Sequence, residues 1–377
     1  MLLLVAAFGL VFWATYTLAA PIQAWLDVTI VGGLTQWLVR ALAGRPTWLV
    51  HLLADGVLSG AGIVITFLPI LVVFFAVLGL LEDTGYLARS AYVMDRFMHR
   101  LGLHGKSFLP LFLGFGCNVP AVMGARIIES RTGRLLTILL APLVPCTARL
   151  AVLAFLAPAF FGRSATIVSW SLVALNILVL ALVGMVLNRT LFQGERAAFI
   201  MQLPLYHVPN LRTIGLFVWS SIWAFLRKTG STILLMSLVV WALSNLPGPD
   251  VEHSYLAQLG RLLSPIGQLM GMDWRLLVAL LSSFVAKENA IATLGVLYGP
   301  GKEAVGLAEK IAAGVSPATA LAFLVVTMLF IPCVATVAAM KQETRSWGWT
   351  SFSIILLLGI ALSAGVVAYQ AGQWLGG

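Results

Sequence analysis

The sequence is poor in charged residues. Asp, Glu, Lys and Arg make up 10% of its 377 residues, hydrophobic residues make up 60%, and the mean hydropathy is +0.99. A soluble domain carries about 25% charged residues and about 45–50% apolar ones, so a water-soluble protein is excluded. A bilayer-spanning helix needs about 20 apolar residues, and the sequence provides this length many times over. The composition therefore predicts an all-α, polytopic transmembrane helical bundle.

Acidic residues and cysteines are also scarce. Only 14 acidic residues stand against 23 Lys and Arg, which gives a net charge of +9. The basic residues lie in short connectors between apolar runs, as in cytoplasmic loops, so no nucleic acid partner is expected. The 3 cysteines cannot form a disulfide framework. They include no Cys-x-x-Cys pair and no neighbouring histidine, so an enzyme using thiol chemistry is not expected.

Apolar runs long enough to span a bilayer are separated by mixed or basic connectors, of which 22–55 and 83–106 read as interfacial. We predict four parts: a first span with an interfacial amphipathic helix (1–55), a first half (56–188), a cytoplasmic or interfacial connector (189–228) and a second half with the terminal spans (229–377). The predicted spans lie at about 1–20, 56–81, 135–161, 165–188, 229–246, 274–298, 318–340 and 349–374.

Two of the apolar stretches carry features that interrupt a helix. In residues 107–126, Pro110 and Pro120 lie on either side of Gly114 and Gly116, which breaks helix continuity at mid-depth. Backbone groups that are freed there must face protein or a water-filled cavity, because lipid cannot satisfy them.

The second stretch, 276–297, places Lys287, Glu288 and Asn289 in the middle of an apolar run. Ionisable residues at membrane depth are costly and usually functional. Both stretches are therefore candidates for a functional site rather than ordinary spans.

The two stretches fit an inverted repeat. If 107–125 dips in from the cytoplasm and 274–298 dips in from outside, the spans at 135–161 and 318–340 run in opposite directions, and each contains a Pro-Cys pair. Broken, re-entrant helices at corresponding positions of two halves are typical of a transport site near the bilayer midplane. In the alternative topology, 274–298 crosses fully and the final span is reversed.

Several strings resemble a known family. The chain is similar over nearly its whole length to the membrane domain of bacterial ferrous iron transport protein B, in strings that follow the family's order. These strings are Glu82-Asp83-Thr84-Gly85-Tyr86-Leu87-Ala88-Arg89, Met94-Asp95-Arg96, Gly102-Leu103-His104-Gly105-Lys106-Ser107-Phe108, Gly114-Phe115-Gly116-Cys117-Asn118-Val119-Pro120-Ala121, Cys146-Thr147-Ala148-Arg149-Leu150, Leu203-Pro204 with Tyr206 and Pro209, Phe284-Val285-Ala286-Lys287-Glu288 and Ile331-Pro332-Cys333.

The resemblance implies a transporter with two gate-like halves that moves Fe²⁺ inward across the bacterial cytoplasmic (inner) membrane. Family members carry a GTP-binding domain before the first span, and none is expected here. The Walker-like string Gly105-Lys106-Ser107 has Arg100 where a P-loop needs glycine. The implied partners are a GTP-binding domain, either cut away or separately encoded, the bilayer, a small cytoplasmic accessory protein and further copies of the chain. Ala151 and Gln202 depart from the family pattern, which expects proline and an acidic residue there.

Cys117, Cys146 and Cys333 are the main candidates for metal ligands. A single cysteine in a membrane helix is usually a small packed hydrophobe, but each of these stands beside a helix-breaking feature. Thiols are soft donors for divalent transition metals, and a few thiols with freed carbonyls can release an ion that a closed four-thiolate site would hold. We expect Fe²⁺ as the substrate and no permanently bound cofactor. The candidate gating elements at the breaks are Gly114, Gly116, Pro120, Pro145 and Pro332.

The polar neighbours each allow two interpretations. The amide oxygen of Asn118 is a candidate metal ligand or a helix cap. Lys287 and Glu288 form either a gating pair or a structural ion pair, and Glu288 is also a candidate ligand, since carboxylates suit Fe²⁺ and Mn²⁺. Arg149 is expected to anchor to a carboxylate or to helix-end carbonyls, because a free cation would repel the metal.

Alternative functions remain open at this point. The ligand set does not separate Fe²⁺ from Mn²⁺. The gate-like architecture also resembles that of nucleoside-recognition membrane proteins, so an organic solute such as a nucleoside is a second candidate substrate, although the broken segments offer few polar side chains to bind one. A receptor or scaffold would show no flux.

Overall fold

The computed structural model describes residues 9, 13, 17–19, 21–42, 50, 52–100, 103, 105–192, 209–246, 254–298 and 314–376. These residues form helices, turns and short connections, with no strand among them. Helical segments that are long and apolar enough to cross a membrane are Thr17–Ala41, Leu52–Asp83, Arg131–Thr190, Pro317–Thr344 and Trp347–Trp374. The predicted all-α, multi-pass helical bundle is therefore confirmed.

The chain divides into two compact units. Unit 1 comprises Met1–Arg96 and Ala198–Ala242, and unit 2 comprises Phe97–Ala197 and Leu243–Gly377. The two units are defined by packing within the structure, whereas the four predicted parts are defined by a repeat in the sequence. The predicted division thus stays a prediction.

Unit 1 is built around the long helix α4, which packs against α11. The Phe75 ring of α4 meets the Phe217 ring of α11 edge to face, with centroids 6.1 Å apart. At the end of α4, the Asp83 carboxylate accepts a hydrogen bond of 2.7 Å from the Asn210 backbone N–H that precedes α11. Its helices are η1 (Leu26–Val31), α2 (Gly32–Ala41), η2 (Leu52–Leu58), α4 (Ser59–Asp83), most of α5 (Tyr86–Arg100), α11 (Leu211–Phe225), η7 (Leu226–Gly230) and most of α12 (Ser231–Asn245).

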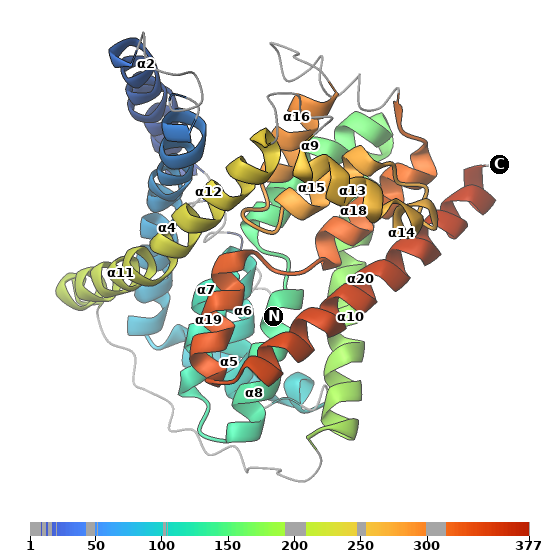
Figure 1. Ribbon diagram of the computed structural model, residues 1–377. Coiled ribbons are helices and arrows are strands. Elements are labelled where there is room, and N and C mark those ends of the chain that lie inside the picture. The colour runs from blue at the N-terminus through green and yellow to red at the C-terminus, as the bar shows by residue number, and fades with distance from the viewer. Residues whose placement is uncertain are drawn as a thin grey trace. The chain divides into compact units, whose positions relative to one another are not determined.

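Unit 2 contains an order of helices that occurs twice: two broken helices, then one long straight helix (Figure 1). The first set is α6 (Phe108–Gly116) with α7 (Asn118–Gly124), α8 (Arg131–Leu140) with α9 (Thr147–Phe161), and α10 (Ala165–Thr190). The second set is α15 (Trp274–Ser282) with α16 (Asn289–Leu297), α18 (Pro317–Leu329) with α19 (Val334–Thr344), and α20 (Trp347–Gly376). Between the two sets lie α13 (Tyr255–Leu262) and α14 (Ser264–Gln268).

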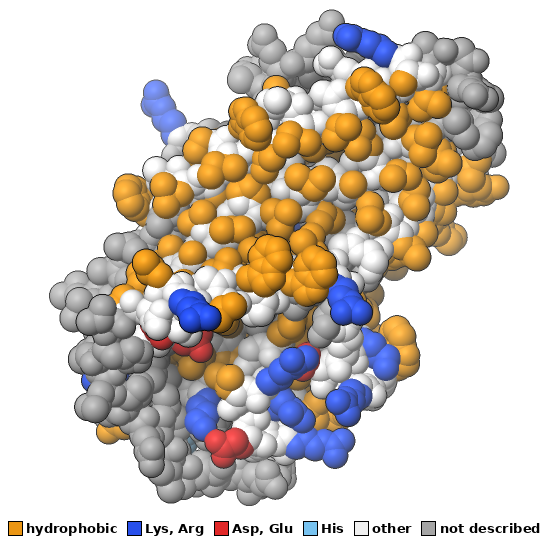
Figure 2. Space-filling model, turned by 90° about the vertical axis from the view of Figure 1, so that its left-hand side faces the viewer, with side chains coloured by type: hydrophobic (Ala, Val, Ile, Leu, Met, Phe, Trp, Pro, Cys, Tyr) orange, Lys and Arg blue, Asp and Glu red, His pale blue; other side chains and the backbone are white. Residues whose placement is uncertain are grey.

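Helix α18 forms the centre of unit 2, because all its residues from Ala322 to Leu329 are buried. It packs along α20 and also contacts α9 and α10. In contrast, the straight helices expose large apolar side chains, among them Ile167 and Trp170 of α10 and Ile355 and Val367 of α20. Figure 2, which views the molecule from the side on which α2, α4 and α11 lie in Figure 1, shows exposed apolar side chains spread over much of that face. Such a surface suits contact with lipid chains.

The structure favours the re-entrant topology for 274–298. Helices α15 and α16 have nine residues each and pack on each other, so each is about 13 Å long, well short of a bilayer core of about 30 Å. In addition, Arg126, which follows α7, pairs with Glu343 near the end of α19. The end of α19 therefore lies on the same side as the 107–126 segment, as the inverted-repeat topology requires.

Other expectations for the spans have mixed outcomes. The predicted interfacial segment 22–55 overlaps the helical stretch Thr17–Ala41, which is long and apolar enough to cross a membrane. Helix α11 occupies part of the predicted connector 189–228. Most of the predicted span at 1–20 lies outside the described residues, as do residues 193–208 with Gln202.

Candidate metal passage

All three cysteines occupy the same structural position, as the residue before a half-helix. Cys117 precedes α7, Cys146 precedes α9 and Cys333 precedes α19, and each has an extended backbone with ψ of 134°, 165° and 157°, respectively. All three are partly buried and free of disulfides. We name these interruptions the Cys117 break (residue 117), the Cys146 break (144–146) and the Cys333 break (330–333), and add the Lys287 break (283–288) between α15 and α16.

The Cys117 break lies against the Cys146 break. Thr147, at the start of α9, donates from its hydroxyl to the Gly116 carbonyl at 2.9 Å. The Asn118 side chain is buried, and with its amide oriented to suit its neighbours, the NH₂ group donates to the carbonyls of Gly114 and Ala141 at 3.1 and 3.2 Å. Both side chains that donate to these carbonyls, Thr147 and Asn118, are neutral.

Gly114 allows this close approach of the two breaks. A Cβ atom at position 114 would lie 2.9 Å from the Val144 Cβ, closer than real Cβ contacts come. The predicted importance of this glycine thus has a packing reason: α6 could not approach the Cys146 break with any larger residue.

Arg149 joins the Cys146 break to the Cys333 break. Arg149 is 1% exposed, and its guanidinium donates to the Pro142 carbonyl at 2.8 Å and to the Phe330 carbonyl at 2.6 Å. The expectation that Arg149 anchors to helix-end carbonyls is confirmed. A buried cation needs such partners, because an unpaired charge in an apolar interior is strongly unfavourable.

The Lys287 break is also tied to the Cys333 break. The Lys287 ammonium, in a residue that is 2% exposed, donates to the Ile331 carbonyl at 2.7 Å and lies 5.2 Å from the centre of the Phe330 ring. The Val334 N–H at the start of α19 donates to the Phe284 carbonyl at 2.8 Å. The hydrogen-bond partner of Lys287 is thus a backbone carbonyl and not the carboxylate of Glu288.

The structure therefore brings the four breaks into one connected cluster. The links run from Thr147 to Gly116, from Arg149 to Phe330 and from Lys287 to Ile331. The thiol of Cys333 also lies 3.3 Å from the Thr336 hydroxyl. However, among the residues that the structure describes, no three His, Cys, Asp or Glu side chains are close enough together to hold a metal ion. The ligand roles of Cys117, Asn118, Cys146, Glu288 and Cys333 remain predictions.

Some residues at the breaks were not recognised from the sequence. Thr147, Thr336 and Asn176, whose amide donates to the Met328 carbonyl at 3.0 Å, all serve backbone or thiol groups. Asn176 is a buried polar residue in an apolar helix, which is a usable signal. The threonines gave none, because hydroxyl residues are common in membrane helices and often bond their own backbone.

Taken together, these helices and breaks define a multi-pass membrane protein with paired broken helices. Comparison with known proteins gives the family. The Gate family, described as nucleoside recognition, matches residues 64–160 and 226–347, and the C terminus of ferrous iron transport protein B matches residues 169–220. Because the first match covers more than half of the chain, the chain belongs to the Gate family. The second match and the relatives below confirm the resemblance to the membrane part of ferrous iron transport protein B.

Three curated relatives illustrate the similarity. The chain is 38% identical over 377 residues to an Fe(2+) transporter FeoB of Staphylococcus aureus, covering 98% of this chain and 56% of the relative. It is 35% identical over 387 residues to that of Methanocaldococcus jannaschii, covering 99% and 57%. It is 37% identical over 372 residues to a fusion of Fe(2+) transport protein A with FeoB from Porphyromonas gingivalis, covering 85% and 44%.

The chain spans about half the length of the curated relatives that it matches. No solved structure gives a significant match. These similarities establish the family of the chain.

Proposed function

We propose that this chain is the permeation part of a ferrous iron transporter of the inner membrane, and that Fe²⁺ passes inward along the connected breaks of unit 2. The observation that carries the proposal is the position of the thiols: all three precede half-helices at interruptions that are hydrogen-bonded to one another. Thiols and freed carbonyls are the groups that such a cation needs along its path. The names of the relatives support the choice of Fe²⁺.

The arrangement suits transient binding rather than storage. The described residues contain no ready group of three ligating side chains, so an ion would be held by one or two thiols at a time, with Asn118 or Glu288 as oxygen donors. Weak binding at successive sites allows release. Under this proposal the protein is a transporter and not an enzyme, and Fe²⁺ is its substrate rather than a resident cofactor.

The proposal includes cytoplasmic partners. The resemblance to ferrous iron transport protein B implies control by a GTP-binding domain. One relative is named as a fusion with Fe(2+) transport protein A. We therefore expect a GTP-binding domain, and a small accessory protein, to act on the cytoplasmic ends of unit 2.

The direct test is metal flux. The full chain, reconstituted in liposomes with and without a candidate GTP-binding domain, is supplied with Fe²⁺, Mn²⁺ or Zn²⁺ under reducing conditions. We expect Fe²⁺ uptake that falls at least about tenfold when Cys117, Cys146 and Cys333 are all changed to Ser, because each ion loses its soft ligands. Uptake of Mn²⁺ should depend less on the thiols, since Mn²⁺ prefers oxygen donors.

A matched sulfur control is available. Met270 is fully buried, and its sulfur lies where a side chain at Gly365 would meet it, in the packing against α20. Met270→Leu removes a sulfur away from the breaks and should leave Fe²⁺ flux unchanged. Unaltered flux in the triple Cys→Ser chain would refute the proposed passage.

A second candidate substrate follows from the family description. The Gate family is described as nucleoside recognition, so nucleosides are tested as competitors in the same liposomes. Competition with Fe²⁺ uptake, or nucleoside uptake in its own right, would favour an organic solute. The breaks present mainly backbone and thiols, whereas a nucleoside pocket needs several polar side chains, so we expect neither.

A further inference from the structure

Two cysteine-bearing half-helices of unit 2 pack directly on each other. Helix α7 follows Cys117 and helix α19 follows Cys333, and the two helices are in contact. They come from different halves of the repeat. The distance between these two thiols thus depends on how α7 and α19 are held together.

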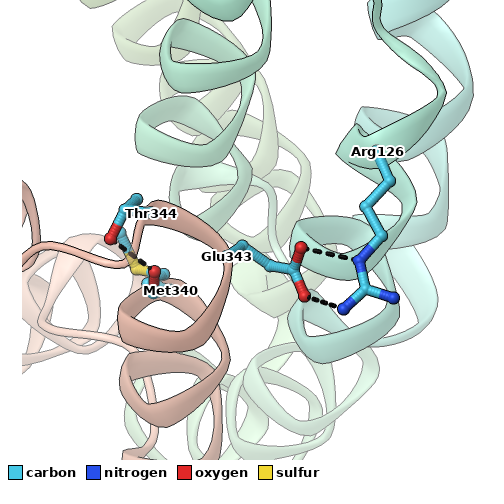
Figure 3. Close-up of polar contacts among 4 residues, drawn as sticks. All are labelled: Arg126, Met340, Glu343 and Thr344. Atoms are coloured by element: carbon cyan, nitrogen blue, oxygen red, sulfur yellow. Dashed lines mark hydrogen bonds and ion pairs between the residues drawn. The ribbon is translucent and has the colours of Figure 1, made fainter.

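The opposite ends of the same two helices are joined by an ion pair. The Arg126 guanidinium donates from Nε to Oε2 of Glu343 at 2.7 Å and from Nη2 to Oε1 at 2.5 Å, as Figure 3 shows. This is the two-pronged geometry that makes arginine–carboxylate pairs strong and directional. The Glu343 side chain is only 8% exposed, whereas that of Arg126 is 55% exposed.

The carboxylate is held in place by the way α19 ends. Thr344 donates from its hydroxyl to the Met340 carbonyl at 2.8 Å (Figure 3), and Arg345 adopts a left-handed backbone with φ of 52° that stops the helix. Met340 is fully buried. Glu343 therefore sits on a fixed helix end, and the partner that can move is the more exposed Arg126.

This end of unit 2 faces the cytoplasm under the positive-inside rule. Besides Arg126, the sequence places Arg131 and Arg134 at the start of α8 and Lys341 and Arg345 at the end of α19. A cytoplasmic domain can therefore reach the ion pair without entering the bilayer.

We infer that the Arg126–Glu343 pair is a cytoplasmic latch. It positions α7 against α19, keeps Cys117 and Cys333 closed off from the cytoplasm, and opens when Arg126 is drawn away. The residues act through the helices that they join and do not touch the ion. The inference rests on the proposed route for the metal, and it adds the point at which that route is closed.

The test measures thiol access in the absence of iron. Chains that keep only Cys117 or only Cys333, with the other two cysteines changed to Ser, are placed in vesicles and treated from the cytoplasmic side with a charged, membrane-impermeant maleimide. We expect Arg126→Ala and Glu343→Ala each to speed labelling about fivefold, the effect of losing roughly 1 kcal/mol of a partly buried pair. The double exchange Arg126→Glu with Glu343→Arg should restore slow labelling.

A second ion pair serves as the matched control. Lys106 and Glu129 pair at 2.7 Å in the same unit, but Glu129 is 88% exposed. Lys106→Ala with Glu129→Ala should leave labelling unchanged. Equal labelling of the Arg126→Ala chain and its parent, or no recovery in the double exchange, would overturn the latch.

The exchange variant also separates loss of the ion pair from misfolding, because it keeps both charges and restores the pair in the opposite sense. Since labelling needs no metal, its outcome is separate from that of the flux assay. Iron flux that does not depend on thiols would remove the proposed passage and leave the latch result standing, whereas unchanged labelling would remove the latch alone.

Discussion

The Cys117 and Lys287 breaks occupy corresponding places in the two halves of unit 2, yet they use different chemistry. The Cys117 break carries a thiol, and the carbonyls around it accept from the neutral donors Thr147 and Asn118. The Lys287 break carries a buried cation that is directed at the Cys333 break. The two halves therefore share the interruption of the helix but not the role of the residue placed there.

The difference bears on how the proposed cation passage tolerates buried positive charge. Arg149 and Lys287 would repel Fe²⁺ if they faced it freely, since two charges in a low-dielectric interior interact strongly. Instead, each points at a carbonyl of the Cys333 break, at Phe330 and Ile331 respectively. The cations stabilise one side of the cluster, whereas the carbonyls beside Cys117 accept hydrogen bonds from the neutral donors Thr147 and Asn118.

The largest expected effect comes from removing Arg149. Arg149→Met leaves the Pro142 and Phe330 carbonyls without their donor, and we expect a loss of about 2–4 kcal/mol of stability, reduced from the full value because a buried charge is also removed. Thermal unfolding in detergent measures it. Arg149→Lys, which can reach one of the two carbonyls, should fall between.

The control for this change is Arg163→Met in η6, an exposed arginine near the end of α9. It should alter the unfolding temperature little. If Arg149→Met and Arg163→Met lower the unfolding temperature equally, the hydrogen bonds of Arg149 do not stabilise the cluster.

A smaller loss is expected for Lys287→Met. One carbonyl, that of Ile331, loses its donor, and we expect about 1–3 kcal/mol of destabilisation by the same measurement. Lys341→Met is the control. Lys341 also lies near an aromatic ring, 5.1 Å from the centre of Trp347, but it stands at the end of α19 and not at a break. Equal stability of both variants would show that Lys287 does not hold the Cys333 break.

The smallest effect tests the neutral side. Thr147→Val removes the hydroxyl that donates to Gly116, and we expect about 1 kcal/mol of destabilisation together with faster labelling of Cys117. Thr190→Val serves as control, since the exposed Thr190 hydroxyl bonds only within its own helix, to Val186. A thiol equally slow to react in both variants would contradict the role of Thr147.

Much of this architecture could be predicted from residue patterns. Proline and glycine located the Cys117, Cys146 and Cys333 breaks, because both residues interrupt a helix wherever they lie. The charges at 287 and 288 located the fourth break for the same kind of local reason.

The partners of these residues could not be predicted. Arg126 and Glu343 are 217 residues apart in sequence, and nothing local in either segment indicates the other. Lys287 was expected next to a carboxylate, but it bonds a carbonyl that exists as an acceptor only because the helix breaks at Cys333. Local pattern fixes where a helix stops, whereas the packing of the whole unit decides what satisfies the freed groups.

The residue before a helix is most often Ser, Thr, Asp or Asn, whose side-chain oxygen caps the first turn and contributes about 0.5–2 kcal/mol. In this chain α7, α9 and α19 instead begin after cysteine, and none of the three makes a side-chain cap. An oxygen side chain at these positions would raise the stability of the folded protein. Sulfur stands at three positions where an oxygen side chain would cap the helix better, so replacing it with serine removes the soft donor and offers each helix a cap.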